Sequence, residues 1–408
     1  MTANGNTLPD IRFPGFSGDW NETPMGELLS FKNGYNAGKE QYGTGKRFIN
    51  VLDIIENDYI THDRITGQVD IPPKDFDKNE VKFGDILFQR SSETREEVGQ
   101  ANVYLDRDKT ATFGGFVIRG RPTNDFDPVF FNAMLKTAKA RKDITSRSGG
   151  STRYNIGQES LEDVLVSIAP TLPEQRKIAD FLTAVDGRIG QLIQKKALLE
   201  DYKKGVMQQL FTQAIRFKDD HGNDFPDWEE KKLGEIGKIT TGKTPSTSDD
   251  AAWVGDTMFV TPSDIGEDTK FQHKTSRHVN GEKLRLIPKH SLMFTCIASV
   301  GKMSIATQPC ITNQQINSVS VGSGFLFEYV YYALRNLTPR IKATQANTTL
   351  PIINKTEFSK FVLSIPHPNE QTKIADFLSA IDCKIESVAT QITETQTFKR
   401  GLLQQMFV

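Results

Sequence analysis

The stretch EQRKIADFL, residues 174–182, is decisive for the fold because it occurs again as EQTKIADFL at residues 370–378. A second phrase, KKGVMQQLF at 203–211, returns as KRGLLQQMF at 399–407. Both pairs are offset by the same 196 residues (370 − 174 and 399 − 203), so the two copies keep one spacing. A helix requires such constancy, since an insertion would rotate its faces relative to each other. The sequence therefore predicts two copies of one long helix.

Apolar residues recur in each copy at heptad spacing, which predicts a coiled coil, the two helices being antiparallel partners of each other. An amphipathic helix lying on its own domain is the alternative. Lys196, Lys203 and Lys399 interrupt the apolar rows, and they indicate either a site where another protein packs or solvated turns. The predicted seam and partner-facing residues are Ile178, Leu182, Val185, Ile189, Leu192 and Leu199 in the first copy, and Ile374, Leu378, Ile381, Ile385, Val388 and Ile392 in the second.

The segments before the helices also repeat, but more faintly. Asp19-Trp20 corresponds to Asp227-Trp228, while between such anchors the two halves share almost nothing. Short β-prone runs such as 113–118 and 257–261 precede helical stretches at 128–141 and 325–341, an order typical of α+β domains. We predict an internal repeat with pseudo-twofold character, in which globular domains at 1–170 and 214–367 alternate with helical spacers at 171–213 and 368–408.

Polar and basic loops follow the predicted strands in both globular domains. Their side chains are of the types that reach base edges and phosphates, although ordinary solvated loops have the same composition. Taken as two sets, the loops favour binding. The candidate DNA-binding residues are Arg90, Ser91, Ser92, Arg95, Arg147, Ser148, Thr152 and Arg153 in the first domain, and Lys243, Thr244, Ser299, Lys302, Asn313, Gln314, Gln345, Asn347 and Thr348 in the second.

Residues 237–244, GKITTGKT, match the phosphate-loop pattern G-x-x-x-x-G-K-[ST]. The context argues against that interpretation, because a phosphate loop follows a buried strand and opens a helix. Here the preceding residues are highly charged and Pro245 begins a turn-rich exit. Only Gly242 has a counterpart in the first half, Gly34. We therefore expect a strand and a turn, and any phosphate at Lys243 or Thr244 to belong to a DNA backbone.

Composition narrows the classes of function. The chain has 408 residues, a formal net charge of −1 and three cysteines, which lie far apart and outside any CxxC pair. These features predict a reduced, cytoplasmic protein without a disulfide framework or zinc site. No apolar run reaches the roughly 18 residues of a membrane span, and no basic and apolar leader is visible. No methyltransferase, zinc-protease or Ser-His-Asp pattern stands out, which favours a binding protein over an enzyme.

Several phrases together resemble a known family. Each helix opens on EQ-x-KIA-x-FL and closes on K(K/R)G…QQ-x-F, and GDILFQRSS at 84–92 and SGGSTRYNI at 148–156 precede the first helix. This arrangement is similar to the specificity subunit of type I restriction-modification enzymes, over nearly the whole chain. The second domain lacks the arginines of both phrases, so Arg90 and Arg153 are expected to serve the first domain alone, as base readers or phosphate contacts.

The resemblance implies a non-catalytic subunit whose two target recognition domains each read one half of a split, asymmetric site in double-stranded DNA. The helices would fix the gap between half-sites and dock two modification subunits, which bind S-adenosylmethionine and methylate adenine. Restriction subunits using ATP and Mg²⁺ would join them, and this chain itself would need no cofactor and no membrane. The alternatives are a coiled-coil assembly adaptor without a nucleic-acid role and a P-loop NTPase.

Overall fold

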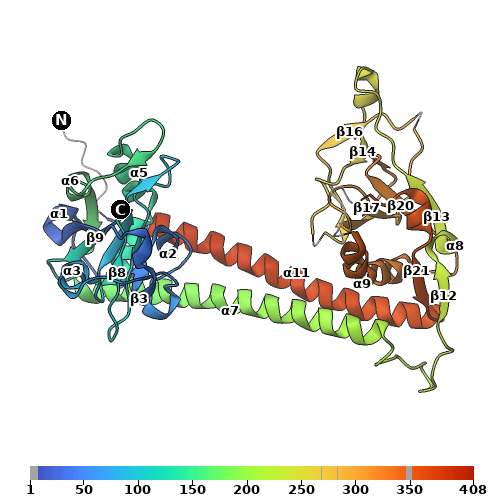
Figure 1. The fold of residues 1–408 in the computed structure, drawn as a ribbon, viewed down its shortest axis with the longest axis horizontal. Helices are drawn as coiled ribbons and strands as arrows, with labels where there is room; N and C mark the ends of the chain where they lie inside the picture. The colour runs from blue at the N-terminus through green and yellow to red at the C-terminus, as the bar shows by residue number, and fades with distance from the viewer. Residues whose placement is uncertain (1–7, 268, 283, 346–351) are drawn as a thin grey trace. The chain divides into compact units, whose positions relative to one another are not determined.

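The computed structural model describes residues 8–267, 269–282, 284–345 and 352–408, with only the backbone described at 344 and 345. The chain forms two compact units, one from the described residues up to Ile193 with Thr390–Val408, the other from Gln194–Ala389. Two long helices contribute to both units: α7, Leu172–Phe211, and α11, Pro368–Gln405. Each unit combines a mixed α+β domain with a segment of each long helix (Figure 1).

The domain of the first unit, which we call recognition domain 1, is built on a four-stranded sheet of order β2-β9-β5-β7 and a three-stranded sheet of order β4-β3-β8. Its first and last strands, β1 and β11, pair antiparallel, as do β6 and β10. The strands are β1 (Asn21–Pro24), β2 (Leu29–Asn33), β3 (Tyr42–Ile49), β4 (Gln68–Val69), β5 (Ile86–Gln89), β6 (Ser91–Ser92), β7 (Ala101–Val103), β8 (Thr112–Phe113), β9 (Val117–Pro122), β10 (Tyr154–Asn155) and β11 (Leu165–Ile168). The helices are α1 (Met25–Leu28), η1 (Lys39–Gln41), α2 (Val51–Ile55), η2 (His62–Arg64), α3 (Pro73–Asn79), α4 (Pro128–Leu135), α5 (Ala138–Ser146) and α6 (Gln158–Glu162).

Recognition domain 2, in the second unit, repeats this plan. Its five-stranded sheet has the order β13-β20-β17-β18-β15, its three-stranded sheet the order β16-β14-β19, and β12 pairs with β21. The strands are β12 (Glu229–Lys232), β13 (Gly237–Thr241), β14 (Thr257–Val260), β15 (Phe271–Gln272), β16 (Arg277–Val279), β17 (Leu292–Thr295), β18 (Met303–Ala306), β19 (Ile311–Thr312), β20 (Ile316–Val321) and β21 (Val362–Ile365). The helices are α8 (Leu233–Ile236), η3 (Asp250–Trp253), α9 (Phe327–Gln345) and α10 (Lys355–Ser359).

Corresponding hydrogen bonds show that the two domains share one scaffold despite their different sequences. The amide of Gly114 donates to the carbonyl of Ile49, and that of Asn313 to Val260, both at 3.0 Å. The amide of Arg90 donates to Phe116, and that of Cys296 to Gln315. The Asp53 and Asp264 carboxylates accept from the amides three residues earlier, at 2.7 and 2.8 Å. The predicted α+β repeat is therefore present in three dimensions as well as in sequence.

The predicted seam residues lie on the inner faces of the long helices. Of the twelve, Ile189, Leu199, Ile385 and Ile392 are half-buried and the other eight are buried. In the first unit, Leu182 and Val185 belong to one core cluster with Leu402 and Met406 of the opposing helix. In the second, Val206 and Leu210 share a cluster with Ile374 and Leu378, and α9 packs its buried tyrosines into the same cluster.

Two of the three lysines that interrupt the seam pair across it. Lys399 Nζ lies 2.5 Å from Asp186, and Lys203 Nζ lies 2.5 Å from Asp382. These pairs are the same interaction in the two copies, since 399 − 203 and 382 − 186 give one offset. Lys196 pairs with Glu200 one turn along its own helix. The seam lysines are thus intrachain ion-pair partners.

The repeated EQ phrase has a structural role. Glu174 accepts a two-pronged hydrogen bond from Arg12 at 2.7 and 2.9 Å, and Glu370 accepts the equivalent bond from Arg216 at 3.1 and 2.8 Å. Both arginines lie within a repeated IRF tripeptide, at 11–13 and 215–217. Gln175 and Gln371, both buried, each accept from a domain amide at 2.8 Å and donate to a carbonyl at 2.9 Å. Each helix therefore begins in a clamp that ties it to its domain.

Candidate nucleic-acid interface

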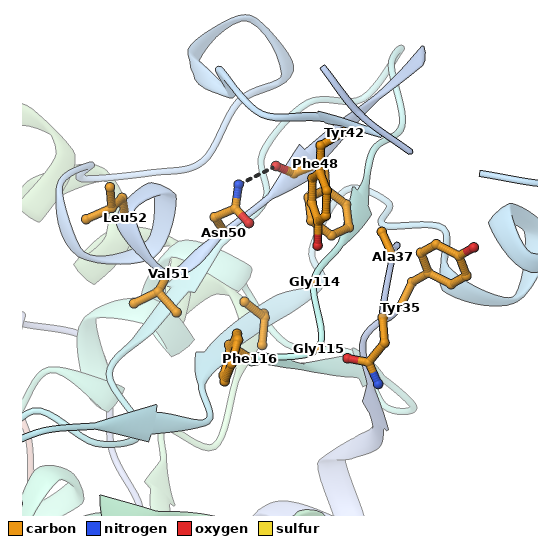
Figure 2. Close-up of a pocket in the computed structure, with 12 residues that line it drawn as sticks. Tyr35, Ala37, Tyr42, Phe48, Asn50, Val51, Leu52, Gly114, Gly115 and Phe116 are labelled. Carbon is orange, nitrogen blue, oxygen red and sulfur yellow. Dashed lines mark hydrogen bonds between the residues drawn. The ribbon is translucent and has the colours of Figure 1, made fainter. Parts of the chain in front are cut away.

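Three loops of recognition domain 1 converge at one place. They follow β2, β3 and β8, at residues 34–37, 50–52 and 114–116, and the second of them runs into the first residues of α2. The amides of Tyr35 and Gly114 donate to the carbonyls of Phe113 and Ile49, at 2.9 and 3.0 Å, which holds the loops together. We call the surface they form tip 1. Figure 2 shows these loops around a cavity of about 390 Å³.

Tip 1 is aromatic and amide in character. Phe116 is 65% exposed and Leu52 60% exposed, both high for apolar side chains. Asn36 and Asn50 are also exposed, and Asn50 Nδ2 donates to the carbonyl of Phe48 at 3.3 Å (Figure 2). Exposed apolar side chains grouped around a cavity mark an interaction surface more often than they mark a fold requirement.

Arg90 links tip 1 to the phrases that carried the family resemblance. Its amide donates to Phe116 at 2.9 Å, and its guanidinium Nη1 donates to the carbonyl of Gly115 at 3.4 Å. The side chain is exposed and has no carboxylate partner among the residues that the structure describes. A guanidinium held beside an exposed loop in this way is free to contact a phosphate or a base edge.

The other candidates of recognition domain 1 lie together beside Arg90. Ser91 and Ser92 form β6, which pairs with β10, so the phrases at 84–92 and 148–156 meet. Several polar groups here already have partners within the domain. Among the arginines, Arg95 donates to the carbonyls of Thr145 and Ser146, Arg147 pairs with Asp143 at 2.9 Å, and Arg153 lies 3.8 Å from Glu93. Among the serines, Ser92 Oγ donates to Glu97 and Ser148 Oγ donates to Thr145. Thr152 is exposed.

The same three loops in recognition domain 2 carry different side chains. The amides of Gly242 and Lys243 donate to Ile316 and Thr312, which places Lys243 and Thr244 where Tyr35 and Asn36 lie in the first domain. Thr244 Oγ1 donates to Gln314 Oε1 at 2.5 Å. We call this surface, formed by 243–245, 261–263 and 313–315, tip 2. It brings four of the predicted residues together: Lys243, Thr244, Asn313 and Gln314.

Tip 2 carries polar side chains at the positions where tip 1 carries exposed apolar ones. Phe116 corresponds to Gln315, Leu52 to Ser263, and the Gly114-Gly115 pair to Asn313-Gln314. Asn313 Nδ2 donates to Gln315 Oε1 at 3.0 Å, while Lys243 and Gln314 are exposed. Amide side chains suit the donor and acceptor pair that adenine presents in the major groove, and a lysine suits a phosphate.

The remaining candidates of recognition domain 2 are more dispersed. Ser299 and Lys302 belong to the turn between β17 and β18, where the Ser299 carbonyl accepts from Thr295 Oγ1 and Lys302 lies 3.8 Å from Glu267. Asn347, Thr348 and the side chain of Gln345 lie outside the described residues. Sequence reasoning did not select Asn36, Asn50, Leu52, Phe116, Ser263 or Gln315. A usable signal was the Gly-Gly pair at 114–115, which disfavours the strand predicted through 113–118.

The phosphate-loop match is not a phosphate loop in three dimensions. Gly237 lies within β13, paired with Val321 of β20, and no helix begins at Gly242-Lys243-Thr244. A phosphate loop needs its lysine at the start of a helix, so that amides and helix dipole face the phosphates. The described part of the chain also shows no cluster of His, Cys, Asp or Glu suited to a metal ion, and no helix long and apolar enough to cross a membrane.

Comparison with known proteins gives one consistent result. The family model of the type I restriction modification DNA specificity domain matches twice, at 17–201 and 226–396. A putative type I restriction enzyme MjaX specificity subunit of Methanocaldococcus jannaschii is 25% identical over 403 residues, covering 94% of this chain and 92% of its own. The solved type I restriction-modification S subunit of M. genitalium is 15% identical with a TM-score of 0.59, covering 98% of this chain and 99% of its own.

A further solved chain, from a study of complex assembly and conformational transition of the type I restriction-modification system, is 17% identical with a TM-score of 0.63 and covers 97% of this chain and 98% of its own. The two family matches take up most of the chain, and each contains one recognition domain with its tip. The chain thus belongs to the family of type I restriction-modification DNA specificity subunits, whose work is the recognition of a DNA sequence and not catalysis.

Proposed function

We propose that this chain reads a split, asymmetric site in double-stranded DNA, recognition domain 1 contacting one half through tip 1 and recognition domain 2 the other through tip 2. One observation carries the proposal. The same three loops occur on the same scaffold in both domains, but their side chains differ at nearly every position. Loops that are held alike and composed differently suit two readers of two different base sequences.

The long helices would fix the spacing of the half-sites. Two features support this role: their constant repeat offset, and the clamps at Glu174 and Glu370 that tie each helix start to its domain. We retain the division into recognition domains at 1–170 and 214–367 and helical spacers at 171–213 and 368–408. The duplicated helix phrases also suit docking of a partner in two copies, since equivalent surfaces recur in one chain.

We assign those partners to the modification subunits, with restriction subunits joining the assembly, in the cytoplasm where the DNA is. The S-adenosylmethionine, ATP and Mg²⁺ of such a system would reside on the partner subunits. Membership of the specificity-subunit family supports this assignment, and so does the likeness to a chain solved in a study of complex assembly. An adaptor without a nucleic-acid role is disfavoured, because it gives no reason for two tips of such different chemistry.

The test is to co-express the chain with its modification subunits and map methylated bases across the host genome. We expect one bipartite, non-palindromic motif. Replacement of residues 216–366 by the equivalent domain of a relative should change one half of the motif and leave the other half and the spacing intact. A palindromic motif, or a change in both halves, would contradict the assignment of one half-site to each domain.

A further inference from the structure

We infer that recognition domain 1 reads its half-site by inserting the Phe116 ring at a base step and unstacking the bases there, whereas recognition domain 2 reads with amides and leaves the stack intact. This inference rests on the proposed function and adds to it a mode of reading for each half. It assigns Phe116 and Leu52 as specificity-determining residues that the family phrases do not include.

The first step is that Phe116 projects from a fixed backbone. The amide of Val117 donates to Gly114 at 2.9 Å, and the Phe116 carbonyl accepts from the Arg90 amide at 2.9 Å. The loop is therefore held on both sides of the ring, while the side chain itself is 65% exposed. A rigid backbone carrying an exposed ring loses little conformational freedom when the ring enters an apolar environment.

The second step is that the fold does not need this ring. Gln315 occupies the same position of the same scaffold in recognition domain 2, with the equivalent hydrogen bond from the Cys296 amide. Ser263 likewise stands where Leu52 does, in the turn that Asp264 caps. Phe116 and Leu52 are thus exposed to water at positions where polar side chains suffice for folding. This arrangement indicates that a binding partner covers them.

The third step is that the surroundings fit nucleic acid. The exposed guanidinium of Arg90 lies beside the loop and can take a phosphate of the same step. The cavity of about 390 Å³ next to Phe116 is lined by the rings of Tyr35 and Phe48, which Figure 2 shows, and by Asn36 and Asn50. Apolar wedges that enter a base step displace and kink the stack, and a neighbouring aromatic cavity with amides gives a displaced base room and partners.

The experiment uses the chain assembled with its modification subunits and a duplex carrying its mapped site. 2-Aminopurine, whose fluorescence rises on unstacking, replaces single bases in turn across both half-sites. Apart from the adenines that the modification subunits methylate and extrude, we expect a rise at one step of the half-site read by recognition domain 1, and none in the other half-site. Phe116→Ala should abolish the rise and weaken specific binding about tenfold, the low end of the cost of losing one base–aromatic contact. Phe116→Leu should keep part of both.

Gln315→Ala is the matched control. It should weaken recognition of the other half-site and leave the 2-aminopurine signal unchanged. If the complex binds its site specifically but no position other than the methylated adenines brightens, or if Phe116→Ala acts only where a thymine methyl is present, insertion is wrong and the proposed function stands. If Phe116→Ala instead impairs assembly with the modification subunits, the ring belongs to a protein interface and the inference also fails. Absence of any specific binding by the assembled parent complex would count against the proposed function itself.

Discussion

The two recognition domains place nearly the same hydrogen bonds under different side chains. Gly114 and Asn313 make equivalent amide bonds, and so do Arg90 and Cys296, yet the exposed groups beside them are an aromatic ring in one domain and an amide in the other. The scaffold is held by hydrogen bonds between backbone N–H and C=O groups, and every residue except proline supplies both groups whatever its side chain. Tip composition can therefore change while the fold persists.

The helix clamps behave in the opposite way, since they repeat side chain for side chain. Arg12 with Glu174 and Arg216 with Glu370 use the same atoms, and the following glutamines bond in the same pattern. A clamp built from side chains cannot change composition without losing its bonds, because a buried charge left alone is costly. The two halves of the chain therefore differ in the exposed side chains of the tips and agree in the side chains of the clamps.

The largest effect that would test this difference is expected at Glu370. Its carboxylate is fully buried and accepts from Arg216 and also from Trp228 Nε1 at 3.0 Å. This hydrogen bonding raises the pKa of Arg216. Glu370→Ala should lower the free energy of unfolding by about 3 kcal/mol, because it strands a charged and a neutral donor. Urea unfolding measures the loss.

Glu174→Ala serves as the comparison in the first unit, where the described donors to the carboxylate come from Arg12 alone. Its cost should be smaller, by roughly the 1 kcal/mol of one neutral hydrogen bond. Equal costs for the two variants would show that Trp228 contributes nothing, and a loss below about 1 kcal/mol in both would refute the clamp.

A smaller effect, on DNA affinity, is expected at tip 2. Gln314→Ala should weaken binding of the assembled complex by about 1–3 kcal/mol, but only at duplexes with the correct base in the half-site of recognition domain 2.

Lys243→Ala should weaken binding to all duplexes. It should also reduce the slope of the logarithm of the binding constant against the logarithm of the salt concentration by about one. Lys302→Ala is the matched control, since Lys302 already lies near Glu267. Binding titrations at several salt concentrations would measure these effects, and a uniform loss for Gln314→Ala would contradict base reading there.

Much of this arrangement could be predicted from the sequence, for reasons particular residues make clear. The repeat at 174–182 and 370–378, with its heptad rows, predicted both long helices, because helical periodicity is a local property of the chain. The polar loops around Arg90 and Lys243 were also visible locally. That Lys243 and Thr244 meet Gln314 was not, since the contact depends on hydrogen bonds between segments some 70 residues apart.

The sequence also concealed the roles of two repeated features. The IRF tripeptides lie 162 and 154 residues from the glutamates that they clamp, so no local pattern connects them. The seam lysines looked like interruptions, because the facing Asp186 and Asp382 belong to the other copy of the helix. The sequence predicts a strand at 113–118 that includes Phe116, whereas in the structure β8 ends before the glycine pair and the Phe116 ring is exposed.

The seam ion pairs at Asp186 and Asp382 allow a second comparison, in which the expected losses of unfolding free energy are of intermediate size. Asp382 accepts from Lys203 and from the Tyr332 hydroxyl, both at 2.5 Å, while Asp186 accepts from Lys399 at 2.5 Å and from Tyr59 at a longer 3.5 Å. Asp382→Ala should therefore destabilise the protein more, by about 2 kcal/mol against about 1 for Asp186→Ala. Urea unfolding of both variants decides the order. The reverse order would mean that the tyrosine contact adds no stability.

The smallest effect concerns Asp53 and Asp264, the equivalent aspartates that accept from a backbone amide at each tip, because their pKa values differ. Burial raises the pKa of Asp53 above its ordinary 3.8. For Asp264, burial acts in the same direction but is outweighed by hydrogen bonds from Ser276 and Thr261, which lower its pKa below 3.8. A raised folded pKa gives stability that is present below pH 3.8 and lost as pH rises through the folded value. A lowered one gives stability that is present above pH 3.8 and lost only as pH falls through the folded value.

Asp53→Asn and Asp264→Asn remove each titration while keeping an oxygen for the cap. As pH rises from 3.8 through the raised folded pKa of Asp53, the parent should lose stability relative to Asp53→Asn, because the variant avoids ionising a buried carboxyl. Over the same window the difference between the parent and Asp264→Asn should stay constant, and it should shrink only in more acidic solution. Urea midpoints measured in parallel cancel titrations elsewhere in the chain. Parallel pH profiles for the two variants would mean that the two tips share their electrostatics as well as their scaffold, and that their difference lies only in the exposed side chains.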